Sequence, residues 1–196
     1  MISKQDILDR ATEWHLRPDV VEKDYVLGWL LAGLAQHAVT RDFWIFKGGT
    51  CIKKCYFETY RFSEDLDFSL VPAAPYTAEE LRQTLSEVAS VVHEMSGILF
   101  PEELIEVRNR HNKQGQPTFQ GKLAYGGPLR QLNNPTPPRV LLDITRHEPV
   151  LDDAHPRGVF HPYPDNLPEG TQVLAYSLDE LLAEKTRGLV RAHKPV

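Results

Sequence analysis

Cysteine is scarce in this 196-residue chain, and its scarcity excludes two classes of protein. The two cysteines, Cys51 and Cys55, are four residues apart, a spacing that places both thiols on one side of a helix. Two thiols in this arrangement build neither a disulfide framework nor a zinc framework. We interpret both residues as small, half-buried hydrophobic side chains.

Long apolar runs and a targeting sequence are also missing. No run approaches the roughly 18 apolar residues that a membrane-spanning helix needs. Residues 1–6 lack the basic start and the apolar stretch of a signal peptide. We therefore predict a cytoplasmic protein without a membrane partner.

The chain has no excess of positive charge. It contains 22 Lys and Arg against 27 Asp and Glu, a formal net charge of −5 at pH 7. This balance excludes binding of nucleic acid through overall charge and leaves room for a local basic patch. A content of 41% hydrophobic and 25% charged residues fits one globular domain and excludes disordered, collagen-like and disulfide-scaffold chains.

The first forty residues predict two helices. Ser3 can cap the first helix, with Asp6 at the acidic position of a capping box. Pro18 marks a boundary, and Asp19 can cap a second helix that runs to about His37. The second helix is apolar on most sides, so we expect it to be buried.

The rest of the chain alternates strand-like and helix-like segments, which predicts an α+β fold. Capping boxes that begin at Thr77 and Ser177 each open a helix. Strands are predicted at 43–46, 66–70, 104–108, 118–124, 139–145 and 172–175, and a helix at 50–57. Loops are predicted at 133–138 and over most of 147–170, with one short strand in the latter.

Two glycines and a threonine stand where the strand at 43–46 gives way to a helix. At such a junction the free N–H groups and the helix dipole of Gly48, Gly49 and Thr50 favour an anion. The alternative is that the Gly-Gly pair serves only the geometry of a tight turn.

Three aspartates form the second candidate cluster. Asp65 and Asp67 alternate along a strand and share one side, where their charges repel unless a cation lies between them. Carboxylate oxygens suit Mg²⁺. Asp143 interrupts an apolar strand, either as a strand-end residue paired with an arginine or as a third carboxylate beside the other two.

Two charged residues fall on apolar helix faces. Lys185 is centred on a stripe of leucines, with Glu180 and Glu184 on the opposite side, and either extends to solvent or reaches an anion. Leucines 178, 181, 182 and 189 form that stripe. Asp24 lies beside Lys23 near the apolar face of the second helix, as a structural ion pair or as support for a site.

These motifs together resemble a known family. Its signature is similar to the segments 46–50 (FKGGT), 54–56 (KCY) and 61–68 (RFSEDLDF), to 21–27 (VEKDYVL) before them, and to 183–185 (AEK) followed by Arg191. The chain is therefore identified as a member of the AbiEii/AbiGii-type nucleotidyltransferase toxins, which include the MenT proteins and belong to the polymerase-β-like superfamily. The resemblance covers residues 3–193.

The resemblance implies a polymerase-β-like nucleotidyltransferase fold, a mixed sheet flanked by helices. It further implies a single domain over 1–196, with N-terminal helices at 1–40, the sheet core at 41–175, and at 176–196 the start of a C-terminal helical part that is cut short.

The family transfers a nucleotidyl group from a metal-bound NTP, in some members to the 3′ end of tRNA, and a cognate antitoxin neutralises it. By this resemblance Asp65, Asp67 and, as in the wider superfamily, Asp143 would hold Mg²⁺ or Mn²⁺, and Lys185 would neutralise phosphate charge. The triphosphate would lie at Gly48, Gly49 and Thr50, with Lys54, Arg61 and Ser63 contacting phosphate or hydroxyl groups.

Two alternatives stay open. The chain is a degenerate domain that binds a nucleotide or a partner without turnover, or it modifies a protein or a small molecule. Any RNA contact would come from Lys53, Lys54, Arg61 and the last helix.

Overall fold

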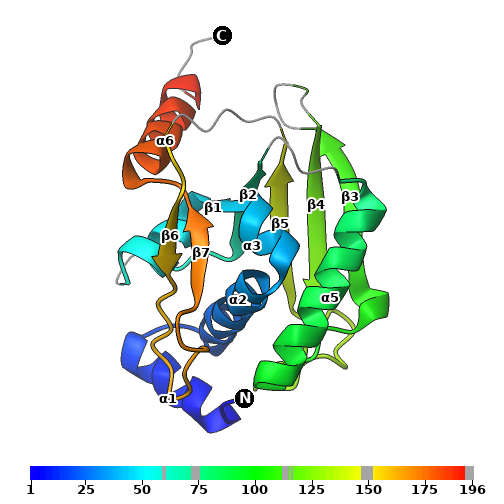
Figure 1. Ribbon diagram of the computed structural model, residues 1–196. Coiled ribbons are helices and arrows are strands. Elements are labelled where there is room, and N and C mark those ends of the chain that lie inside the picture. Colours follow the sequence, from blue (N-terminus) through cyan, green and yellow to red (C-terminus); the bar gives the residue numbers. More distant parts are fainter. Residues whose placement is uncertain (59–60, 72–75, 112–114, 116, 147–151, 193–196) are drawn as a thin grey trace.

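A seven-stranded sheet organises the chain (Figure 1). The computed structural model describes residues 1–58, 61–71, 76–111, 115, 117–146 and 152–192, with the backbone alone for 187–192. The helical elements are α1 (Lys4–Trp14), α2 (Pro18–Gln36), α3 (Ala38–Phe43), α4 (Gly48–Cys51), the π-helical η1 (Ile52–Tyr56), α5 (Ala78–Ser96), the 3₁₀ turn η2 (Glu102–Leu104) and α6 (Leu178–Ala192). The strands are β1 (Trp44–Lys47), β2 (Asp65–Leu70), β3 (Ile105–His111), β4 (Pro117–Ala124), β5 (Arg139–Thr145), β6 (His155–Gly158) and β7 (Gln172–Ala175).

The sheet is mixed, with the strand order β3-β4-β5-β2-β1-β7-β6. Strand β2 pairs with β5, and β1 with β7, in parallel, whereas the other neighbours are antiparallel. The α+β prediction and the mixed sheet flanked by helices are thus confirmed.

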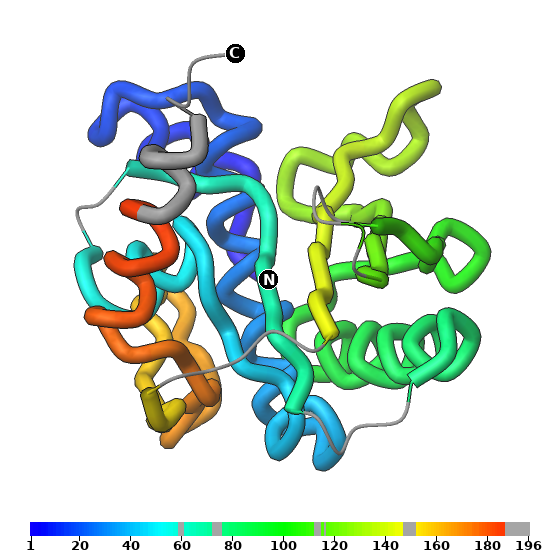
Figure 2. The backbone as a smooth tube through the Cα atoms, turned by 90° about the horizontal axis from the view of Figure 1, so that it is seen from above, coloured from blue at the N-terminus to red at the C-terminus, as the bar shows by residue number. Residues whose placement is uncertain are grey.

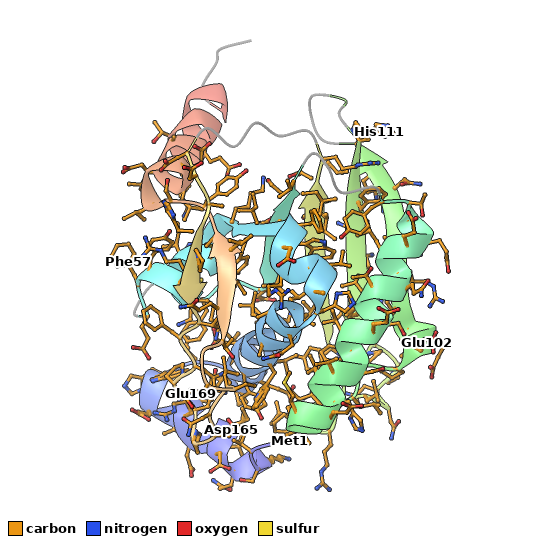
Figure 3. All side chains as sticks on the ribbon, in the orientation of Figure 1. Met1, Phe57, Glu102, His111, Asp165 and Glu169 are labelled. Carbon is orange, nitrogen blue, oxygen red and sulfur yellow. The ribbon has the colours of Figure 1, made fainter. Side chains whose placement is uncertain are left out.

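Helices α2 and α5 cover one face of the sheet, and their side chains fill the space against it (Figures 1 and 3). Every residue of α2 from Val21 to Leu34 is buried except Lys23. This burial confirms the prediction for the second helix. The view from above shows α6, β6 and β7 at one side of the molecule and α5, β3 and β4 at the other (Figure 2).

The caps of the first two helices follow from short-range chemistry. The Ser3 hydroxyl accepts from the Asp6 N–H at 3.2 Å, and the Asp6 carboxylate accepts from the Ser3 N–H at 2.7 Å, so this capping box is confirmed. The prediction that Asp19 caps α2 is wrong. Arg17 occupies the cap and Pro18 the first helical position, where its missing N–H costs nothing; Asp19 accepts from Arg17 instead.

The predicted strand bounds agree with the observed ones within one residue, except that the edge strand β3 runs to His111 and not to 108. Strands β5 and β7 have the predicted bounds, whereas β1 begins one residue late because Phe43 closes the unpredicted helix α3. Strand β6 supplies the short strand expected within 147–170, of which 147–151 lie outside the described residues. In the described ranges, no helix combines the length and the apolar character that crossing a bilayer requires.

The close contact of α2 with α5 depends on Gly33. A Cβ at this position would overlap Val92 Cγ2 and lie 3.2 Å from Val88 Cγ1. We expect Gly33→Ala to lower the free energy of unfolding by about 1–3 kcal/mol, because the overlap outweighs the better helix propensity of alanine. Urea denaturation measures the change.

Gly158 provides the control for this substitution. A Cβ there would meet nothing within 4 Å, so Gly158→Ala should leave stability within about 0.5 kcal/mol of wild type. A Gly33→Ala variant as stable as Gly158→Ala would show that the helices separate without cost.

Candidate active site

The register of two parallel strands brings the predicted carboxylates together. Asp67 on β2 pairs with Asp143 on β5, and Asp65 pairs with Leu141. Paired residues of neighbouring strands project to the same face, with backbones about 4.8 Å apart. Asp65, Asp67 and Asp143 therefore lie on one face of the sheet. The sequence predicts this for Asp65 and Asp67; for Asp143 it agrees with the interpretation as a third carboxylate beside them.

The electrostatics of this face disfavour negative charge. The pKa of Asp67 is raised to about 6: burial is the largest cause, the charges of Asp143, Asp65 and Glu184 also raise it, and Lys47 lowers it. Burial and the Asp143 charge also raise the pKa of Asp65. A cation at this face would relieve both effects.

The Gly-Gly turn closes over the same carboxylates. Gly48 follows β1 with φ +77°, and a Cβ there would overlap Asp67 Oδ2, so both conformation and space require glycine. A Cβ at Gly49 would lie 3.3 Å from Ser63 Oγ. The buried Thr50 hydroxyl donates to the Asp65 carbonyl at 2.6 Å, which fixes the turn to the start of β2.

The helical segment after the turn begins at Gly48 and runs through α4 and η1 to Tyr56. Lys47 is the N-cap residue of this segment, and among the described residues no side chain makes a capping hydrogen bond there. The first N–H groups of a helix have no partners within the helix. Here these N–H groups begin at Gly48, which lies against Asp67, and Gly49, which lies against Ser63.

Comparison with known proteins adds the family. The family model described as "Nucleotidyl transferase AbiEii toxin, Type IV TA system" matches residues 29–195. The chain belongs to the AbiEii family. No curated protein matches it. Family membership assigns nucleotidyl transfer as the activity class and a toxin of a toxin–antitoxin system as the role.

Sequence reasoning missed two charged residues of this AbiEii-family site. Lys47 is 8% exposed, and its Nζ lies 3.2 Å from Glu184 Oε1 of α6. Lys47 is also the antiparallel partner of Asp67. The sequence did hold a signal for Lys47, because it is the last strand residue before the two glycines.

The apolar stripe predicted for α6 holds only in part: Leu181 is buried as expected, but Leu182 is 51% exposed. The placement of Glu180 and Glu184 on the opposite, solvent side is wrong, because Glu180 is buried and Glu184 pairs with Lys47. Lys185, next in sequence, is half-buried; the side chains of 187–192, with those of Leu189 and Arg191, lie outside the described residues.

Lys54 is not brought to the carboxylates. Its Nζ donates to Asp24 Oδ2 at 2.8 Å, and both side chains are 1% exposed. The Tyr163 hydroxyl donates to the same oxygen at 2.8 Å, and the Phe160 carbonyl lies 3.5 Å from Lys54 Nζ. Asp24 is therefore part of a buried ion pair with Lys54, which favours the structural one of its two predicted roles.

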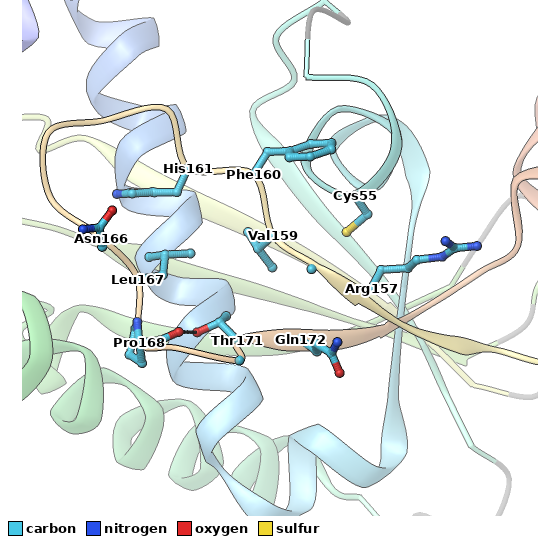
Figure 4. Close-up of a pocket in the computed structure, with 12 residues that line it drawn as sticks. Cys55, Arg157, Val159, Phe160, His161, Asn166, Leu167, Pro168, Thr171 and Gln172 are labelled. Atoms are coloured by element: carbon cyan, nitrogen blue, oxygen red, sulfur yellow. Dashed lines mark hydrogen bonds between the residues drawn. The ribbon is translucent and has the colours of Figure 1, made fainter.

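The remaining predicted residues divide between two places. Ser63 packs beside Gly49, whereas the exposed Arg61 lines a separate cavity with Phe62. Another cavity, of about 580 Å³, lies between η1 and the loop before β7, lined in part by Cys55 and Arg157 (Figure 4). It contains none of the predicted site residues.

The donors present fit a divalent metal only as a partial ligand set. Within the described ranges, no three His, Cys, Asp or Glu side chains are arranged so that they could hold a metal ion together. Asp65, Asp67 and the exposed Asp143 supply oxygen ligands alone, and Gln120 Nε2 donates to Asp143 Oδ1 at 3.3 Å. Mg²⁺ commonly takes one or two carboxylates and completes its shell with substrate phosphates and water, so the residues fit such a group.

The raised pKa of Asp67 predicts a pH-dependent stability. Its pKa is about 6 in the folded chain against 3.8 for the free side chain, so ionisation costs stability as the pH rises from about 4 to 6. We expect Asp67→Asn to match wild type at pH 4 and to exceed it by at most about 3 kcal/mol at pH 7.5. Urea denaturation of the metal-free protein at both pH values tests this.

Asp42 is the matched control. Its carboxylate is exposed, and a hydrogen bond from Arg41 lowers its pKa, so Asp42→Asn should bring no gain at pH 7.5. An equal difference between Asp67→Asn and wild type at the two pH values would contradict the assigned shift.

The buried Lys54–Asp24 pair predicts a rescue. Lys54→Met leaves Asp24 buried without its cation, and we expect a loss of about 3–5 kcal/mol in the free energy of unfolding. Asp24→Leu combined with Lys54→Met removes both charges and should recover most of that loss. A double variant no more stable than Lys54→Met would count against the pair as the reason for the loss.

Proposed function

We propose that this AbiEii-family chain transfers a nucleoside monophosphate from an NTP to an acceptor hydroxyl at the 3′ end of an RNA. The observation that carries the proposal is the pairing of Asp67 with Asp143 directly beneath the Gly48 turn. Carboxylates for a metal and free N–H groups for phosphates are the two components that phosphoryl transfer requires.

Asp65, Asp67 and Asp143 would hold Mg²⁺ or Mn²⁺. Bound there, the metal would supply Lewis-acid activation of the hydroxyl and charge neutralisation on the phosphates. Asp143, the exposed member of the three, would accept the proton of the attacking hydroxyl. The new bond joins that oxygen to the α-phosphorus, and the bond to pyrophosphate breaks.

The N–H groups at Gly48, Gly49 and Thr50 would bind the triphosphate, with Ser63 beside them. Lys47 would offset the negative charge of the phosphates from the strand side and Lys185 from α6. The Lys47–Glu184 contact at 3.2 Å holds the lysine at the site before substrate binds. A cognate antitoxin as partner is part of this proposal, supported by the family's type IV toxin–antitoxin description.

The test is label transfer. Each of the four labelled NTPs is incubated with protein, Mg²⁺ and total tRNA, and we expect label in RNA with at least one of them. Asp65→Ala and Asp67→Ala should each reduce transfer by at least about 100-fold, the scale of losing one electrostatic stabiliser of a transition state. Circular dichroism checks that the variants are folded.

Asp42→Ala, at an exposed carboxylate of α3, is the control and should retain full transfer. Full activity of an Asp65→Ala/Asp67→Ala double variant would refute the metal assignment. Absence of transfer with every NTP would favour a binding domain without turnover, and label in protein would favour a protein acceptor.

A further inference from the structure

A cavity of about 500 Å³ opens between α1, η1 and the segment that leads into β2. We name it the α1 cavity; Arg10, Trp14, Lys53, Glu58, Arg61 and Phe62 are among its lining residues. None of the three carboxylates lines it. Three of its lining residues, Arg10, Trp14 and Leu16, precede the span that the family model matches. Its size is within the range of small-ligand sites.

The α1 cavity is positively charged in a chain of negative net charge. Three cations, Arg10, Lys53 and Arg61, and one acid, Glu58, line it, and Arg10 is also paired with Glu13 at 2.8 Å. Lys53 is only 4% exposed, and burial lowers its pKa. Its Nζ donates to the Glu58 carbonyl at 2.9 Å and makes no ion pair within the described ranges.

The neighbouring Lys54 has a carboxylate partner, and within the described ranges Lys53 has none. Lys54 is equally buried but has the carboxylate of Asp24 at 2.8 Å. Lys53 instead lies 3.9 Å above the centre of the Phe62 ring. A buried ammonium group with a carbonyl and a ring as partners would gain most from an anionic ligand.

Aromatic rings form the other wall. Trp14 and Phe62 have ring centroids 5.5 Å apart at 44°, and the Arg10 guanidinium lies 5.2 Å from the Trp14 centroid. Both rings are half-buried and line the cavity. Flat aromatic walls beside cations are the chemistry by which proteins bind unpaired nucleotides, with the base on a ring and the phosphate on Lys or Arg.

The cavity also adjoins the carboxylates along the chain. Phe62 precedes Asp65 by three residues, so their Cα atoms are at most about 11 Å apart. Lys23 holds the intervening Glu64 with an Nζ–Oε2 distance of 2.8 Å. A nucleotide in the cavity would therefore lie close to the reacting end of a bound RNA.

We propose that the α1 cavity binds an unpaired nucleotide of the acceptor RNA, with its base against Trp14 and Phe62 and its phosphate at Lys53 and Arg61. This proposal rests on the proposed function in one respect, that the acceptor is RNA. It adds a second point of contact, which selects RNAs with a single-stranded end.

The test measures binding without chemistry. A short single-stranded RNA with a 5′ dye is titrated with protein in EDTA and without NTP, and fluorescence anisotropy gives the affinity. We expect Arg61→Gln to weaken binding about tenfold and to reduce the slope of log affinity against log salt by about 0.7, the value for one lost phosphate contact.

Phe62→Leu separates stacking from charge. It should weaken RNA binding several-fold with the salt slope unchanged, and it should leave the KM for NTP unchanged. Arg82→Gln removes the same charge from α5, where Arg82 contacts Glu79 and Glu102, and should bind RNA as wild type does.

Wild-type protein that binds no RNA would overturn the proposal. So would Arg61→Gln and Phe62→Leu variants that bind RNA as Arg82→Gln does. If these variants keep RNA binding but lose neutralisation by the antitoxin, the cavity is a protein site and the proposal is wrong. The proposed function and the cavity proposal can fail separately. RNA binding that depends on the cavity, without any label transfer, would refute only the proposed function. Label transfer that the cavity variants leave unchanged would refute only the cavity proposal.

Discussion

Strands β2 and β5 pair in parallel, and their register sets the carboxylates of Asp67 and Asp143 side by side. Burial of Asp67 is the main reason that its pKa rises to about 6, and the like charge of Asp143 on the neighbouring strand adds to the cost of ionisation. The Gly48 turn packs against the same carboxylate. The repelling carboxylates and the N–H groups of the helix start thus lie side by side at Gly48. A cation would offset the charge of the carboxylates, and bound phosphates would accept from the N–H groups.

Three lysines near this point show how the fold assigns different roles to one residue type. Lys47 turns to Glu184 at the site, Lys54 is enclosed with Asp24, and Lys53 lies over Phe62 in the α1 cavity. Lys53 and Lys54 are adjacent in the π-helical η1, so their side chains point in different directions. Their neighbours, and not their chemistry, decide which of the two forms an ion pair within the fold.

Local patterns predicted much of the fold. The capping boxes at Ser3 and Thr77 form as expected, because each is completed within four residues. Strand β5 has its predicted bounds, and its buried residues Val140, Leu142 and Ile144 alternate with more exposed positions, as in a strand. Two errors concern the ends of elements: Phe43 joins α3 before β1 begins, and Arg17 takes the cap expected at Asp19 because Pro18 occupies the first helical position.

The sequence by itself determined the family, the carboxylate pair Asp65 and Asp67, and the glycine turn, because these depend on residue type and short spacing. Only the tertiary structure decided that Asp143 stands beside Asp67, that Lys54 serves Asp24, and that α6 turns Glu184 to the site. Periodicity shows which residues share a face of an element. It does not show which neighbour that face meets, because this choice depends on contacts between residues far apart in the chain.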